Sequence, residues 1–326
     1  MADPAAKAIV GDRSYLVSKK VDNVMLVGAG GGNVFDTVYT GGVDFAYKTI
    51  YLTADLDMGG RKAADGSWTG PNWTPIGGTT ASTAFKGSFD GKNHTVKNMG
   101  IYYSATTTSA PYKGLFGYVN GTSSSYATIQ NLKVTGKMYL TSTGSVANAY
   151  SGGVVAYANY TNISSVVSDV DITVTRVNGN WSSVGGVAGR LVNSNATNCG
   201  NEGTIHAYQY AGGITGYATG TITGCYNNAP VTGKESAGGV CGKNSGTVQM
   251  SYNTGAVTGT LKTGGVCGES ADRSTLANCY NTGMLVGDSV VGGICGSVES
   301  SADVSNSFSM AEICGNSNIG GNIGTG

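Results

Sequence analysis

A phrase of two glycines, a branched aliphatic residue, a small residue and a further glycine recurs through the second half of the chain. It begins at Gly185, Gly212, Gly238, Gly264 and Gly292, and Gly320 opens a further copy, so the period is 26 to 28 residues. A fixed period of this length is typical of a solenoid, whose units are each too short to enclose a core of their own. Each apolar face must therefore be covered by the units above and below it, and we expect the functional surface to be long and repetitive.

The composition suits short strands joined by tight corners, because 54 of the 326 residues are glycine and only 12% are charged. The 19 basic and 19 acidic residues give a formal net charge of zero. Nothing therefore attracts a polyanion over long range, and we expect no nucleic-acid partner. The apolar stretches are far shorter than the roughly 18 residues of a membrane span, so we expect no membrane insertion.

Within one unit the sequence predicts strands at residues 238–242, 247–252 and 256–260, with turn residues between them. Stacked units then form parallel sheets around a narrow core, which is an all-β parallel β-helix. We expect one continuous domain, with an irregular N-terminal cap and first coils in residues 1–100, wide irregular coils in 101–184 and regular coils in 185–326. A cap is expected because an open sheet edge invites association.

Equivalent positions of the units form columns of like residues. The columns comprise aliphatic residues (Val187, Ile214, Val240, Val266 and Ile294), aromatic residues (Tyr226, Tyr252, Tyr280 and Phe308) and residues that tolerate positive φ (Asn131, Asn198, Gly224, Asn278 and Asn306). The last column predicts a left-handed corner in each coil. Met250 interrupts it, which indicates either a distorted corner or a faulty alignment there.

Seven cysteines occur, six of them in two repeat columns. The columns hold Cys241, Cys267 and Cys295 in one position and Cys199, Cys225 and Cys279 in the other, with Cys314 apart. Small apolar neighbours indicate thiols used as compact packing residues. Adjacent coils would allow a disulfide, but the odd number leaves at least one thiol free. Ligands in one column do not converge on a centre, so a metal site is the less favoured alternative.

The repeats resemble the GLUG motif of bacterial surface proteins and IgA-peptidase-like proteins, on the phrase at 264–268 followed by residues 276–283. Residues 48–57 and 85–99 resemble the segment that precedes such repeats, and 114–117 with 129–132 resembles a first, looser repeat. The resemblance implies a right-handed parallel β-helix in an exported protein. IgA-peptidase relatives use a zinc site on a His-Glu-x-x-His helix. Neither His94 nor His206 is followed by Glu, so we do not expect that activity here.

A tyrosine-rich stretch is the predicted ligand surface, because exposed tyrosines near Asn and Ser can stack on sugars and donate hydrogen bonds. Its candidate residues are Tyr102, Tyr103, Tyr112, Tyr126, Tyr157 and Tyr160. Ordinary packing in a wide coil is the alternative. Asp55 and Asp57 would share one face of a strand and are candidates for a calcium site or a glycosidic carboxylate pair, although a turn or capping role is favoured.

These observations predict a non-catalytic, extracellular adhesion or display module of the bacterial cell surface, which binds a glycan or a host or microbial protein and needs no cofactor. The alternative is a β-helical polysaccharide-acting enzyme, a lyase or glycoside hydrolase, with Asp55 and Asp57 in its cleft. An enzyme requires titratable groups that converge, and the repeats contain no acidic column. Residues 320–326 stop inside a repeat, so we also expect a larger-protein context or end-to-end association.

Overall fold

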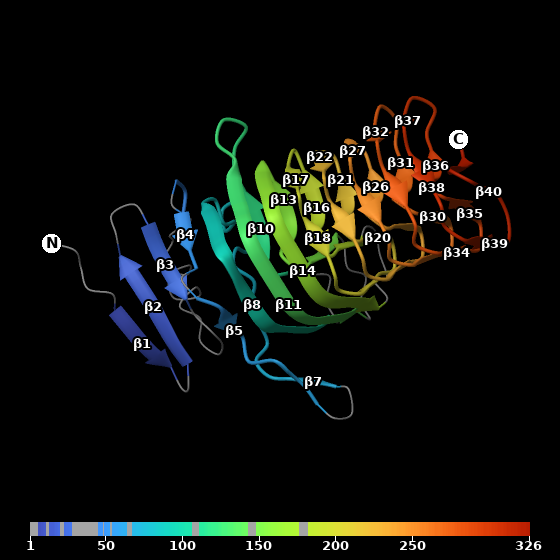
Figure 1. Cartoon of the computed structure of the whole chain (residues 1–326). Coiled ribbons are helices and arrows are strands. Elements are labelled where there is room, and N and C mark those ends of the chain that lie inside the picture. The colour runs from blue at the N-terminus through green and yellow to red at the C-terminus, as the bar shows by residue number, and fades with distance from the viewer. Residues whose placement is uncertain are drawn as a thin grey trace.

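The computed structural model describes residues 6–10, 13–19, 23–27, 45–47, 49–52, 54–63, 67–105, 111–142, 148–175 and 182–326. The rest of the predicted cap, including residues 28–44, lies outside the described residues. Short strands stack from the N-terminal end to the C-terminal end in a curled array (Figure 1). The pairing between successive coils is parallel, which confirms the prediction of an all-β parallel β-helix. The described segments contain no helix long and apolar enough to cross a membrane.

Two sheets receive one strand from each coil. In the described residues, sheet 2 contains β10 (Phe116–Asn120), β13 (Val155–Asn159), β16 (Ala188–Val192), β21 (Thr215–Ala218), β26 (Cys241–Asn244), β31 (Cys267–Ser270), β36 (Cys295–Val298) and β41 (Ile323–Thr325). Sheet 3 contains β9 (Tyr112–Lys113), β12 (Ala149–Gly152), β15 (Ser182–Gly185), β20 (Tyr210–Gly212), β25 (Ser236–Gly238), β30 (Lys262–Gly264), β35 (Val290–Gly292) and β40 (Ile319–Gly320).

Sheet 1 is the broad sheet, to which each regular coil contributes three short strands. They are β17 (Asn195–Thr197), β18 (Gly200–Asn201), β19 (Ile205–His206), β22 (Thr221–Thr223), β23 (Tyr226–Asn227), β24 (Val231–Gly233), β27 (Thr247–Gln249), β28 (Tyr252–Asn253), β29 (Val257–Gly259), β32 (Thr275–Ala277), β33 (Tyr280–Asn281), β34 (Leu285–Gly287), β37 (Asp303–Ser305), β38 (Phe308–Ser309) and β39 (Ile313–Gly315). In the earlier coils the long strands β8 (Ser88–Ala105), β11 (Ala127–Ser142) and β14 (Thr161–Thr175) replace these triplets.

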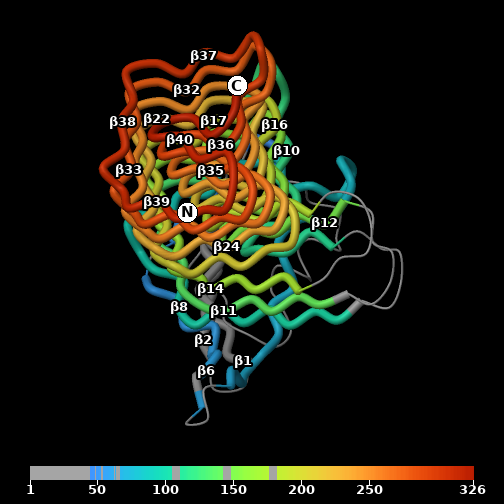
Figure 2. The backbone as a smooth tube through the Cα atoms, turned by 90° about the vertical axis from the view of Figure 1, so that its right-hand side faces the viewer, coloured from blue at the N-terminus to red at the C-terminus, as the bar shows by residue number. Residues whose placement is uncertain are grey.

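The N-terminal part continues sheet 1. Its strands are β1 (Ala6–Val10), β2 (Arg13–Lys19), β3 (Asn23–Val27), β4 (Thr49–Tyr51) and β5 (Leu56–Asp57), beside a separate pair, β6 (Arg61–Lys62) and β7 (Trp68–Thr69). β1, β2 and β3 pair antiparallel, whereas β3–β4 and β4–β8 are parallel. The early coils are wider than the regular coils stacked on them (Figure 2). β8 spans the predicted boundary at residue 100, and the predicted division into three regions remains a prediction.

The predicted strands within one unit are wrong in detail. Residues 238–242 do not form one strand, because β25 ends at Gly238 and β26 begins at Cys241 after a sharp corner. Residues 247–252 are likewise divided into β27 and β28 by the left-handed residue Met250, whose φ is 49°. The corner at residue 239 interrupts the strand without interrupting the pattern of apolar residues, so periodicity did not reveal it. The corner at Met250 belongs to the column for which a left-handed corner was predicted, but the strand assignment ran through it.

The aliphatic column fills the core as predicted. Val240 and Val266 are fully buried, and the Val240 N–H donates to the Val266 carbonyl at 2.9 Å, so the two residues are immediate neighbours along the axis. Cys241, Cys267 and Cys295 are also fully buried and pair in successive strands. Burial raises the pKa of the Cys279 thiol to about 11. All seven cysteines lie in the described part of the chain without a disulfide, and only Cys314 is exposed, which fits a packing role for the other six.

The aromatic column lies on the outside of sheet 1. Tyr226, Tyr252 and Tyr280 are half-buried and Phe308 is exposed. Successive rings stack at centroid distances of 5.7, 4.9 and 5.7 Å and at interplanar angles of 16°, 2° and 14°. Stacking adds about 0.5 to 1.5 kcal/mol per pair beyond the burial of area. The column therefore reinforces the register of the coils from the solvent side.

The predicted left-handed column is confirmed. Its φ values are 52° at Asn131, 52° at Asn198, 64° at Gly224, 55° at Asn278 and 47° at Asn306. Met250 adopts the same conformation and is 54% exposed. The alignment is thus correct and the corner is retained. The methionine backbone adopts the left-handed conformation, which costs less free energy for glycine and asparagine.

A buried ladder of asparagine side chains runs along the axis and explains the second glycine of each phrase. Each Nδ2 donates to the next side-chain oxygen, from Asn201 through Asn227, Asn253 and Asn281 to Ser309, at 2.7, 2.7, 2.8 and 3.3 Å. The four asparagines are fully buried. A Cβ added to Gly239 would lie 2.2 Å from Asn253 Cγ and 2.3 Å from the Gly265 carbonyl oxygen. The coil is therefore too narrow here for any side chain but hydrogen.

We expect Gly239→Ala to lower the free energy of unfolding by about 2 kcal/mol or more, because the added methyl meets backbone that cannot withdraw. Gly321→Ala is the matched control in the same column, since nothing lies within 4 Å of its added Cβ, and it should change stability by less than about 0.5 kcal/mol. Urea unfolding followed by circular dichroism measures both. Equal stability of the two variants would contradict the ladder's steric role.

We expect Met250→Asn to raise the free energy of unfolding by about 1 kcal/mol, because asparagine adopts the left-handed conformation at lower cost and the exposed methionine contributes little burial. The reciprocal change, Asn278→Met, should lower stability by a similar amount. Thermal unfolding compares the pair. A destabilised Met250→Asn protein would mean that the methionine side chain contributes more than its backbone costs.

Candidate functional site

The repeated phrase places two columns of outer side chains at the junction of sheets 2 and 3. The residue directly after each phrase lies in sheet 2, and the residue two places before it lies in sheet 3. The sheet 2 column is Tyr118, Tyr157, Arg190, Tyr217, Lys243, Glu269 and Ser297. The sheet 3 column is Tyr112, Tyr150, Ser183, Tyr210, Ser236, Lys262 and Val290. The corner between the sheets brings the two columns into contact.

Four tyrosines meet at the N-terminal end of this junction, and we call them the tyrosine cluster: Tyr112, Tyr118, Tyr150 and Tyr157. The ring of Tyr157 stacks on Tyr112 at 5.7 Å and meets Tyr118 edge-on at 4.8 Å. Tyr150 is buried, while the other three are half-buried. Burial raises the pKa of Tyr112 to about 12, so its phenol stays neutral and can both donate and accept a hydrogen bond.

Arg190 occupies the next position of the sheet 2 column. Its guanidinium lies 4.5 Å from the Tyr217 ring centroid and 5.4 Å from that of Tyr150, and Nη1 donates to the Tyr150 hydroxyl at 2.8 Å. Its Nε is buried and has no hydrogen-bond partner among the described residues. Asn148, Arg190, Tyr217 and Lys243 line a cavity of about 200 Å³, which we call the arginine cavity. Polar donors and an aromatic ring thus surround an open space.

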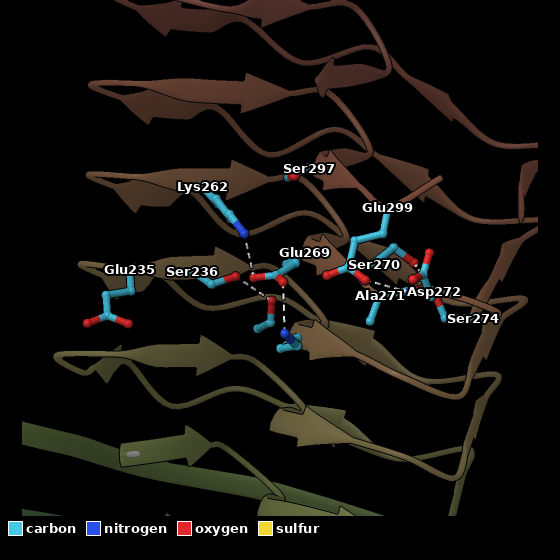
Figure 3. Close-up of polar contacts among 12 residues, drawn as sticks. Glu235, Ser236, Lys262, Glu269, Ser270, Ala271, Asp272, Ser274, Ser297 and Glu299 are labelled. Carbon is cyan, nitrogen blue, oxygen red and sulfur yellow. Dashed lines mark hydrogen bonds and ion pairs between the residues drawn. The ribbon is translucent and has the colours of Figure 1, made fainter. Parts of the chain in front are cut away.

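An ion triad follows along the same columns. Glu269 receives Lys243 on Oε1 and Lys262 on Oε2, both at 2.8 Å, and its side chain is only 8% exposed. Figure 3 shows Lys262 reaching Glu269 from the neighbouring sheet. Burial raises the pKa of Glu269, but the two lysines outweigh it and hold the pKa below its ordinary value. Burial lowers the pKa of Lys243, but the bond to Glu269 keeps that pKa above its ordinary value.

The structure places two of the six predicted tyrosines in the tyrosine cluster. Tyr112 and Tyr157 belong to the tyrosine cluster, whereas Tyr126 and Tyr160 form a separate edge-on pair at 5.9 Å. The Tyr103 ring lies under Lys113 Nζ at 4.4 Å. The Tyr102 hydroxyl is buried, with no hydrogen-bond partner in the described part of the chain. The tyrosine-rich stretch therefore does not form one continuous surface.

Asp55 and Asp57 have separate partners. Asp55 pairs with Lys97 at 2.6 Å and with His94 at 3.5 Å, whereas Arg61 donates to both oxygens of Asp57, at 3.0 and 2.9 Å. The bond from Lys97 lowers the pKa of Asp55, and that from Arg61 lowers the pKa of Asp57. Within the described ranges, no group of three or more His, Cys, Asp or Glu side chains could hold a metal ion. His206 lies apart, beside a cavity of about 340 Å³ with Tyr208 and Lys234.

No protein-family model matches the chain, and no curated protein matches it significantly. The chain is similar to the crystal structure of a "putative immunoglobulin A1 protease" from Bacteroides ovatus. The TM-score is 0.57 and the sequence identity 19%, over 90% of this chain and 81% of that chain. At this identity the likeness shows the fold alone. It supports a distant IgA-peptidase-like fold, while the likeness to GLUG repeats remains a resemblance.

Sequence reasoning missed Arg190, Tyr217, Lys243 and Glu269, although a signal for them was present. Each directly follows the repeated phrase, at intervals of 26 or 27 residues. The predicted columns were those in which the same residue type recurs, whereas the residue type in this column differs from coil to coil. A search for variable polar residues at a fixed repeat position would have found it.

We expect Glu269→Gln to lower the free energy of unfolding by about 2 kcal/mol or more at pH 7, because it leaves two lysines without their shared anion. Asp288→Asn, at an exposed position, is the control and should change stability by less than about 0.5 kcal/mol. Because the folded pKa of Glu269 lies below the unfolded value of about 4.3, its contribution is fully present above that pH and is lost as the pH falls through the folded pKa. Urea unfolding from pH 7 to pH 3 should show that the difference in free energy of unfolding between wild type and Glu269→Gln shrinks below about pH 4.3. A difference that does not depend on pH would contradict this account.

Proposed function

We propose that this chain is a non-catalytic, extracellular module of the bacterial cell surface that binds a glycan at the junction of sheets 2 and 3. The observation that carries the proposal is the tyrosine cluster beside the arginine cavity. Half-buried tyrosines offer ring faces and edges to a sugar and neutral hydroxyls to its oxygens. The extracellular location rests on the resemblance to repeats of bacterial surface proteins.

A binding role suits the titration behaviour of the junction. Burial raises the pKa of Tyr112 and Tyr157, while the lysines hold the pKa of Glu269 low, so these groups are poorly placed to exchange protons near neutral pH. The alternative of a polysaccharide-acting enzyme needs an available acid and base. Asp55 and Asp57, its candidate carboxylates, are each held by a basic side chain.

A glycan array identifies a ligand, and isothermal titration calorimetry then compares variants. We expect Tyr157→Ala to weaken binding about tenfold, equivalent to about 1.4 kcal/mol, and Tyr157→Phe to retain most of the affinity. Tyr252→Ala, which removes a half-buried ring from the outer stack of sheet 1, is the control and should bind normally. Release of shortened or unsaturated sugars during incubation with polysaccharides would favour the alternative of an enzyme. Binding to none of the glycans on the array would contradict the proposal.

A further inference from the structure

The arginine cavity combines a cation that lacks an anionic partner with open space in front of it. Among the described residues, Arg190 forms no ion pair, and its Nη1 donates a hydrogen bond to the Tyr150 hydroxyl. A guanidinium carries five N–H donors in a planar fork that matches a carboxylate. Nη1 uses one donor on Tyr150 and Nε is buried, so the donors left for a ligand in the cavity are the remaining N–H groups of the two Nη atoms.

The charges around the cavity favour an anion. Lys243 lines the cavity with Arg190, and Lys262 joins Lys243 at Glu269. Arg190, Lys243 and Lys262 thus supply three positive charges around one carboxylate that binds only the two lysines, which leaves two positive charges in excess. Glu235 and Glu299 are the other acidic side chains of this neighbourhood (Figure 3), and neither lines the cavity. The Glu235 carboxylate accepts from the Gln209 amide at 2.8 Å. The Glu299 carboxylate acts electrostatically on Lys243 but accepts the backbone N–H of Asp272 at 2.9 Å.

The surroundings of the cavity suit a sugar. Its volume of about 200 Å³ holds a single monosaccharide, and its lining includes an aromatic residue, Tyr217, and an amide residue, Asn148. Tyr150 is a member of the tyrosine cluster and contacts Arg190, so the next sugar of a chain would reach the other tyrosine rings. A charged group and an aromatic platform therefore lie one coil apart.

We propose that the arginine cavity binds the carboxylate of an acidic sugar, so that the ligand of this module is a glycan bearing hexuronic or sialic acid. The inference rests on the proposed glycan-binding function and adds the class of sugar. Arg190 forms a charge-assisted, two-pronged hydrogen bond with the carboxylate, and Lys243 adds a second positive charge. Neutral glycans engage the tyrosine cluster alone and bind more weakly.

Titration calorimetry of the full chain tests this with two acidic probes, tri-galacturonic acid and 3′-sialyllactose, each beside its methyl ester. At least one acid should bind tenfold or more tightly than its ester, and comparing the two identifies the source of the carboxylate. Arg190→Gln should remove the preference for the acid and leave the affinity for the ester. Lys234→Gln is the control, because Lys234 also lies over a tyrosine ring, that of Tyr208 at 4.8 Å, but lines the other cavity.

Asn148→Asp keeps the test decisive if Arg190→Gln does not fold. Asn148 is exposed and has a φ of 57°, a conformation that aspartate also tolerates. Its new negative charge should weaken binding of the acid several-fold and spare the ester. Equal affinity for acid and ester would overturn the inference and leave the proposed glycan function standing. If neither probe binds while a neutral glycan from the array does, the inference fails alone, and if no glycan binds, both proposals fail.

Discussion

The buried asparagine ladder fixes how each coil sits on the next. An amide that donates to its counterpart one coil away leaves no freedom to slip by a residue, because a slip would bury unpaired donors and acceptors. Each amide also donates to a carbonyl two residues along its own coil, as Asn253 does to Gly255 at 2.7 Å. The ladder thus closes the turn within a coil and sets the register between coils. The second glycine of each repeated phrase lies on the opposite side of the coil, where it contacts the ladder.

The outer surface inherits its order from this register. Lys243 meets Glu269 because Cys241 pairs with Cys267 two residues earlier in the same strands. The spacing of 28 residues after Glu269 does not disturb the sheet 2 column. The extra residues lie in the turn between β31 and β32, which is longer than the equivalent turn between β26 and β27. Insertions at that corner leave both the core and the junction of sheets 2 and 3 unchanged.

The sequence predicted those parts of the fold in which one residue type repeats at a fixed position. Val240, Tyr252 and Asn278 each belong to such a column, and each was placed correctly because its role needs the same chemistry in every coil. The number of strands per coil was not predictable in this way, since the corner at Gly239 depends on steric limits that the stacked neighbour imposes. The corner at Met250 has a residue type that does not itself indicate a left-handed backbone. The tyrosine stretch was divided among separate places because alternation and coil width decide which side each ring faces.

In a solenoid, the backbone is repeated, so a binding site must come from columns whose side chains differ between coils. The sheet 2 column does this: it reads tyrosine, tyrosine, arginine, tyrosine, lysine, glutamate and serine from Tyr118 to Ser297. Its first two positions are aromatic, the cations Arg190 and Lys243 follow on either side of Tyr217, and the anionic Glu269 precedes the neutral Ser297. Stacked coils hold these groups at a regular separation, close to that of paired strands. Because the tyrosine cluster lies on the N-terminal side of Arg190, a chain-like ligand of the proposed kind would bind in one direction, with its charged residue toward the C-terminal coils.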